Sequence, residues 1–181
     1  LTQYGLRLRT GYEVSPGFMP FAEVLLDTRK YDLKADSTGF RRDSDGLQLR
    51  AGTSIELTRT LTGEISAGYG LRRYEDQRLG DLRAPVVEAV LAWAMSPLTT
   101  LRLRGATEFE ETTIAGSPGA VTRRLSAELS HAFLRNLTAT ATASYGRSDF
   151  QRVTRQDDTL RAGFGLEYAL TRNLVMRGSF S

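Results

Sequence analysis

The sequence contains no cysteine, which excludes a disulfide framework, a thiolate metal site and catalysis by a thiol. Its only histidine is His131, so a metal site built from several histidines is excluded as well. Long apolar runs are also missing, because no stretch approaches the roughly 18 apolar residues of a transmembrane helix. The first residues lack the apolar core of a signal peptide, so if the protein is exported we expect its signal to have been removed. We expect no metal and no cofactor.

Lysine is scarce too, since Lys30 and Lys34 are the only two and nearly all the positive charge is arginine. The formal net charge is +3, and the arginines alternate with carboxylates instead of gathering in one segment. Nucleic-acid binding would require clustered basic residues, so we expect no nucleic-acid partner. The length of 181 residues predicts a single domain, residues 1–181.

Apolar and polar residues alternate along most of the chain, which predicts β-strands with one apolar and one polar face. In the segment 47–57, for example, leucine, alanine and isoleucine at odd positions oppose Gln48, Arg50 and Glu56 at even ones. Ten strands are predicted in this way, over residues 3–14, 18–31, 46–57, 62–74, 84–95, 99–112, 121–133, 137–150, 158–170 and 173–181.

The predicted strands and their connections are typical of an outer-membrane barrel. Most runs have roughly 12 to 14 residues, whereas soluble sheets use about 5–6 and membrane strands about 9–11. Short connections alternate with long ones, as in barrels with tight periplasmic turns and longer external loops. A repeated motif also enters a strand at Leu61, Leu98, Leu137 and Leu174. The sequence therefore predicts an antiparallel up-and-down transmembrane β-barrel with ten visible strands.

The polar face of such a barrel must point into the lumen, because Arg or Lys on the lipid face at mid-membrane costs about 2–4 kcal/mol. A sheet can span a membrane only if it closes and satisfies its own backbone. The predicted lumen-lining charges are Arg7, Arg9, Glu13, Glu23, Asp27, Arg29, Arg50, Glu56, Glu64, Arg72, Glu88, Arg102, Arg104, Glu108, Glu110, Arg124, Glu128, Arg161, Glu167 and Arg177.

Aromatic residues on the apolar face form two predicted belts, one for each membrane interface. Tyr12, Trp93, Phe133 and Tyr168 lie near the short turns. Tyr69, Phe109 and Tyr145 lie towards the long connections. A soluble barrel with an aromatic core is the alternative, and it requires the apolar face to point inward.

The sequence offers no catalytic set. By alternation, His131 lies on the lipid side near a short turn, where a polar-tipped ring fits the membrane interface. The segment Asp43 to Gly46 resembles the start of a calcium loop but lacks the later ligands. The Gly-x-Gly motifs at Gly68 and Gly163 lie inside predicted strands, without the helix that a phosphate loop needs.

The segments 20–32, 42–76 and 91–103 resemble the beta-barrel porin family of Gram-negative outer membranes. The resemblance continues through 131–150 and 166–174 and covers most of the chain. It implies a single outer-membrane barrel that contacts lipid and lipopolysaccharide and carries no catalytic motif. Barrels of this type end in a complete strand with a terminal aromatic residue, whereas the last strand here stops at Ser181. We therefore expect missing C-terminal strands and twelve or more strands in the complete barrel.

Three functions remain open from the sequence. The first is a structural or partner-binding barrel, or a narrow pore, with a link to envelope polysaccharide export and to other envelope proteins. The second is a general diffusion porin. The third, an outer-membrane hydrolase, lacks a nucleophile and base on one face, so we expect no enzymatic activity. Paired luminal charges would form a structural network, and a wider barrel would use them to line a pore.

Overall fold

The computed structural model describes residues 2–32, 39–112, 114, 117–171 and 174–180, and this part of the chain folds into strands. None of it forms a helix of the length and hydropathy needed to cross a membrane. The strands are β1 (Thr2–Gly11), β2 (Phe18–Lys30), β3 (Ser44–Thr58), β4 (Leu61–Tyr74), β5 (Leu82–Ser96), β6 (Thr99–Glu110), β7 (Ala120–Leu134), β8 (Leu137–Phe150), β9 (Gln156–Thr171) and β10 (Leu174–Phe180).

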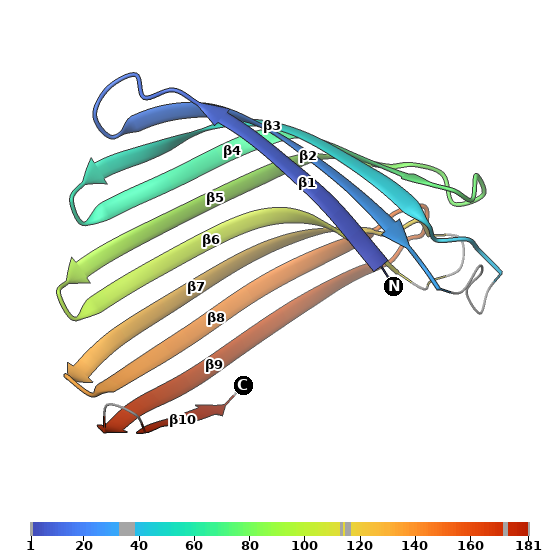
Figure 1. Ribbon diagram of the computed structural model, residues 1–181. Coiled ribbons are helices and arrows are strands. Elements are labelled where there is room, and N and C mark those ends of the chain that lie inside the picture. The colour runs from blue at the N-terminus through green and yellow to red at the C-terminus, as the bar shows by residue number, and fades with distance from the viewer. Residues whose placement is uncertain (1, 33–38, 113, 115–116, 172–173, 181) are drawn as a thin grey trace.

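All ten strands belong to one antiparallel sheet, in which each strand pairs with the next along the chain. The predicted all-β, up-and-down class is confirmed. Figure 1 shows the sheet curling around an open interior, with the short turns at one end and the longer connections at the other. The sheet is not closed, because no pairing joins β1 to β10 among the described residues. We call the two ends of the sheet the turn end and the loop end.

The largest difference from the predicted boundaries is at the first strand, which was expected to reach residue 14. It ends at Gly11, although the amides of Tyr12 and Val14 still donate to the carbonyls of Pro20 and Phe18, both at 3.1 Å. The chain then turns at Gly17, whose φ of +77° lies in the region that glycine adopts without strain. The ends of the last predicted strand, residues 173 and 181, lie outside the described residues.

The internal repeat corresponds to a repeated turn structure. Register shifts at Glu56/Thr58, Ala94/Ser96 and Ala132/Leu134 precede three of the short turns. A carbonyl of each turn accepts a hydrogen bond from a backbone amide on the strand that follows the hairpin, and each bond is 2.8 Å long. The bonds run from Ala94 N to Thr60 O, from Ala132 N to Leu98 O and from Ala169 N to Asn136 O. The repeat therefore joins successive hairpins at the turn end.

The charged face of the sheet lies on its concave side. Arg9 on β1 forms a 2.7 Å ion pair with Glu64 on β4, and side chains from strands this far apart can meet only across a concave surface. Large apolar residues of the other face are exposed, and Leu49 is 52% exposed beside Arg50 at 9%. Apolar residues therefore cover the outside of the curve, as a lipid-facing surface requires.

Close backbone approach at Gly68 accompanies this curvature. A Cβ at this position would overlap the backbone of Leu49 and Arg50 on β3. Gly68 is thus required by packing inside a strand and not by a turn, and a phosphate-binding role is not needed to explain it.

Candidate functional site

The inner face of the sheet carries a ladder of ion pairs that crosses from strand to strand. Arg50 illustrates it, because this arginine bonds to Glu23 on β2 and to Glu88 on β5, the latter at 2.6 Å. Glu88 is shared in turn with Arg104 on β6 at 2.9 Å. The ladder continues through Arg104 and Arg124 to Glu108. It therefore links β2 to β7 without interruption.

Most of the predicted lumen charges belong to ion pairs of this kind. Further pairs join Arg7 to Glu23, Arg72 and Arg29 to Asp27, Arg102 to Glu128, Arg124 to Glu110 and Arg177 to Glu167. Within the described part of the chain, Glu13, Glu56 and Arg161 have no such partner. The structure thus brings together the predicted charges in pairs and leaves three of them available.

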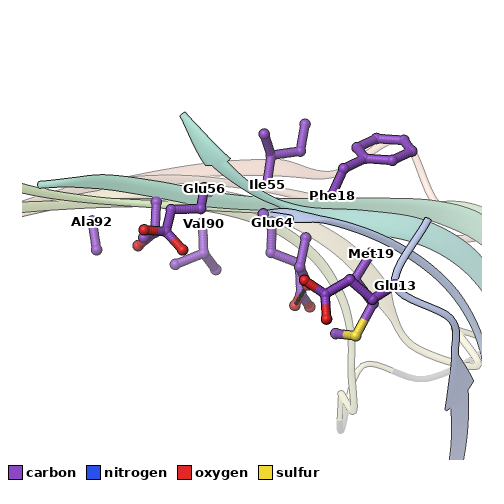
Figure 2. A pocket seen from close by; sticks show the side chains of 12 residues that line it. Glu13, Phe18, Met19, Ile55, Glu56, Glu64, Val90 and Ala92 are labelled. Carbon is purple, nitrogen blue, oxygen red and sulfur yellow. Dashed lines mark hydrogen bonds between the residues drawn. The ribbon is translucent and has the colours of Figure 1, made fainter. Parts of the chain in front are cut away.

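The first hollow in the inner face lies near the turn end and has a volume of 450 Å³. We call it the acidic hollow because its charged lining consists of Glu13, Glu56 and Glu64. In Figure 2 these three side chains project from the side of the sheet opposite to Ile55 and Phe18. Both guanidinium Nη atoms of Arg9 donate to Glu64, at 2.9 and 2.7 Å, so this carboxylate is neutralised. Glu13 and Glu56 keep the hollow negative.

The second hollow, with a volume of 560 Å³, lies over β6 to β9. We call it the basic hollow because it is lined by Arg102, Arg104, Arg124 and Arg161, against the single carboxylate of Glu128. Val90 lines both hollows, so they are adjacent on the inner face. An acidic surface and a basic surface therefore face the same interior side by side.

The loop end of the inner face is covered. Residues 117–122, at the entrance of β7, are all buried, and Ser117 and Pro118 are fully so. The same part of the structure contains an apolar cluster of Tyr74, Leu79, Leu82, Ala84, Val86, Phe109 and Val121. We call this assembly the loop-end cap. It replaces solvent with packed side chains over the ends of β4 and β5.

The prediction that Phe109 belongs to the outer aromatic belt was wrong. It is only 9% exposed, and a Cβ at Gly70 on the inner face of β4 would meet its ring. The cause is that β6 pairs with β5 only as far as Ala106 and continues to Glu110 with β7 alone. Freed from β5, the end of this hairpin crosses the inner face, and the nominally outer side of β6 packs onto it.

Polar contacts attach the cap to β2 and to the chain before β3. Glu111, just after β6, forms a 2.7 Å ion pair with Arg29 on β2. Arg42 donates to the carbonyls of Ser117 and Ile114 at 3.3 and 3.4 Å. These contacts involve residues more than 70 positions apart. Sequence alternation placed Arg29 on the inner face but gave no signal for these partners, because Glu111, Arg42, Ile114 and Ser117 lie outside the strands of the structure.

A second set of contacts organises the connection after β4. Arg78 forms hydrogen bonds with both carboxylate oxygens of Asp76, at 2.9 and 2.6 Å, and donates to Gly39 O at 2.7 Å. The bonds from Arg78, together with the backbone amide of Arg41, hold the pKa of Asp76 well below its ordinary value. Arg152 donates to the carbonyl of Arg78 at 3.1 Å, so the β8 to β9 connection is joined to the same group.

The other predicted belt aromatics are not buried. Near the turn end Tyr12, Trp93, Phe133 and Tyr168 are exposed, as are Tyr69 and Tyr145 towards the loop end. Tyr145 donates to Asp158, which also accepts from Arg147. Outward charges of this kind, including Arg123 and its partner Asp149, were not among the predicted residues. Their parity in the alternation could have identified them.

His131 lies at the turn end and contacts Thr99 and Phe133. Its Nδ1 is 2.8 Å from the Thr99 hydroxyl, and the Phe133 ring packs edge-on at 4.6 Å between centroids. The pair resembles the hydroxyl and imidazole of a catalytic triad, but no carboxylate is among the described contacts of His131. Among all residues that the structure describes, no group of three or more His, Cys, Asp or Glu residues could hold a metal ion.

The model of a family described as Putative beta-barrel porin 2 matches residues 1–181. A search of curated proteins found none similar to the chain.

Proposed function

The chain belongs to the Putative beta-barrel porin 2 family, and from this membership we propose that it forms the wall of a narrow, charge-lined pore in a bacterial outer membrane. One observation carries the proposal: the charged face lies on the concave side of the sheet and the apolar face is exposed. Charges on the concave side favour a wet interior, and an apolar exterior favours lipid and lipopolysaccharide as its surroundings.

The loop-end cap supports a narrow pore over a general diffusion porin. Buried side chains occupy the inner face at the ends of β4 and β5, so part of the cross-section at the loop end is filled. The acidic and basic hollows leave the turn end more open. A passage of this shape admits water and small ions and restricts larger solutes.

A second candidate function is a structural or partner-binding barrel without useful conduction. It is favoured by the extent of ion pairing, because charges that neutralise one another across the interior stabilise a barrel without serving a solute. Either barrel fits a role in envelope polysaccharide export together with other envelope proteins. Co-purification of envelope proteins with the barrel, and loss of surface polysaccharide in a deletion strain, would test that role.

We further propose that the protein is not an enzyme. His131 contacts a threonine hydroxyl and a phenyl ring, and its ring lies with the outward-facing residues of β7. The variant H131A is expected to retain the conductance of the wild type. Hydrolysis of an ester or peptide probe by the wild type that is lost in H131A would contradict the proposal.

Single-channel conductance of the whole protein in a planar lipid bilayer tests the pore. Stable, ohmic current steps of small size are expected, and steps with little dependence on solute size would favour the general porin. Insertion without current would favour the structural barrel. Failure to insert would overturn the membrane function altogether.

A further inference from the structure

Arg161 is the one arginine of the basic hollow without a carboxylate partner in the described part of the chain. The other three are paired: Arg102 with Glu128 at 3.0 Å, Arg104 with Glu88 at 2.9 Å and Arg124 with Glu110 at 2.8 Å. Glu88 is shared with Arg50, and Arg124 also contacts Glu108, so these pairs belong to one connected ladder. From Arg7 to Glu110 this ladder holds four arginines and four glutamates and is neutral as a whole, and the separate pair of Arg102 and Glu128 is neutral too. The hollow therefore carries about one uncompensated positive charge, located on β9.

The arginines of the hollow also have many unused hydrogen-bond donors. A guanidinium group has five N–H donors. Among the described contacts, Arg102 and Arg104 each use one donor on a carboxylate, and Arg161 uses none. These arginines line an open space of 560 Å³, in which their remaining N–H groups need acceptors. A planar carboxylate accepts two parallel N–H bonds from one guanidinium.

Small hydroxyl side chains form the floor between the arginines. In the strand register Arg161 lies opposite Ser144, Ser144 opposite Ser126, and Ser126 opposite Arg104. Neighbouring strands are about 4.8 Å apart, so the backbones of Arg161 and Arg104 are separated by roughly 14 Å along a flat sheet. Both side chains can reach a small molecule that rests on the serines, and the serine hydroxyls can bond to its hydroxyl groups.

We propose that the basic hollow binds a small, hydroxyl-rich monoanion through its carboxylate, and that a sugar acid is the fitting class of ligand. Arg161 supplies the uncompensated charge, Arg102 and Arg104 supply further donors, and Ser126 and Ser144 contact the hydroxyl groups. A dianion fits less well, because the neighbouring glutamates already balance the other arginines. The inference deepens the proposed pore, since it rests on the inner face being open to water.

The test uses the whole protein refolded in detergent micelles and three probes with the same sugar ring. Glucuronate has a carboxylate, glucose has no charge, and glucose 6-phosphate is a dianion. The NMR signals of the arginine Nε–H groups report on each arginine separately. Glucuronate is expected to shift the signals of Arg161 and Arg102 in a saturable way, and glucose is expected to leave them unchanged. Equal shifts with glucose, or tighter binding of glucose 6-phosphate, would overturn the assignment.

Variants then locate the site. R161Q is expected to weaken glucuronate binding about fivefold, because one exposed charged contact is lost. R161K should recover part of the loss, because it restores the charge without the planar fork. The matched control is R123Q on β7, which removes the same charge next to Arg124 but on the outer face, and should bind like the wild type. Equal weakening in R123Q would show that general charge, and not the hollow, attracts the ligand.

Binding and conduction are measured separately, so the two proposals can fail separately. Glucuronate binding without single-channel current would preserve the site and overturn the pore. Current without glucuronate binding would overturn the site and preserve the pore. Should R161Q fail to refold, the wild-type comparison of the three probes and the R102Q variant still decide the result.

Discussion

Arg72 at the loop end and Arg102 at the turn end occupy equivalent positions in the alternation, and both pair with a carboxylate across the sheet. Arg72 has an exposed fraction of 2% and bonds to Asp27 at 2.5 Å, whereas Arg102 is 62% exposed and bonds to Glu128 at 3.0 Å. The difference comes from the loop-end cap, which covers one end of the inner face and leaves the other open. The same sequence pattern thus yields a buried structural network at one end and an accessible charged surface at the other.

The largest effect is expected from breaking these two ion pairs in the same way. R72M should destabilise the folded protein by about 3 kcal/mol, because it removes one partner of a buried charge pair. R102M should cost less than about 1 kcal/mol, as exposed pairs do. Chemical unfolding in lipid vesicles, followed by the fluorescence of the single tryptophan, Trp93, measures both. Equal losses would show that the cap does not shield Arg72.

A smaller contrast is expected between two phenylalanines. F109A should cost about 3 kcal/mol, because it leaves a cavity in the apolar cluster of the cap. Phe133, at the turn end, is 61% exposed, so F133A should cost roughly 1 kcal/mol. The same unfolding measurement applies. A greater loss for F133A would place the main stabilisation at the aromatic belt and not in the cap.

The ion pair between Glu111 and Arg29 should contribute still less. E111Q is expected to weaken the attachment of the cap to β2 by about 1 kcal/mol, which corresponds to roughly fivefold faster amide exchange at Val121 and Thr122. E167Q is the control, because Glu167 pairs with Arg177 at 2.8 Å away from the cap. Unchanged exchange in E111Q would mean that Arg42 and the apolar cluster hold the cap without this pair.

The smallest expected effect is the dependence of the cap on acid. Because the folded pKa of Asp76 is lowered, its stabilising contribution is fully present above the ordinary carboxyl pKa of about 4 and is lost as the pH falls towards the folded pKa. Protection of the Leu79 amide, which donates to Asp76 O at 3.0 Å, is the measure once the intrinsic pH dependence of exchange is removed, and it should therefore fall below pH 4 in the wild type. D76N should show lower protection at pH 7 and little further change of protection on acidification. The same acid dependence in D76N would assign it to another carboxylate.

Most of the strand arrangement was predictable because it depends on local periodicity. The two-residue alternation located all ten strands, and the repeated turn motif located their junctions at the turn end. Phe109 shows the limit of this reasoning. Its parity with Leu101 and Leu103 is correct along β6, but parity cannot reveal that β5 separates from β6 after Ala106 and that the hairpin end then crosses the interior.

The sequence predicted which charged residues face the interior, but it did not predict which of them come together in each hollow. Arg161 and Arg104 were both expected on the inner face, yet their position on either side of a floor of serines depends on strand register. Likewise, Glu13 lies beyond the end of β1 and joins Glu56 in the acidic hollow only because of the turn at Gly17. Pairing partners across non-adjacent strands depend on curvature, which no single strand encodes.

The sequence by itself determined the strands, the two faces of each strand and the chemical character of both faces, because these follow from side-chain order at a period of two. The tertiary structure decided which charges are neutralised, which stay available and which end of the interior is covered. Those features depend on contacts between residues far apart in the chain, such as Arg9 with Glu64 and Arg29 with Glu111. They arise only when the sheet curves and a hairpin end folds across its concave side.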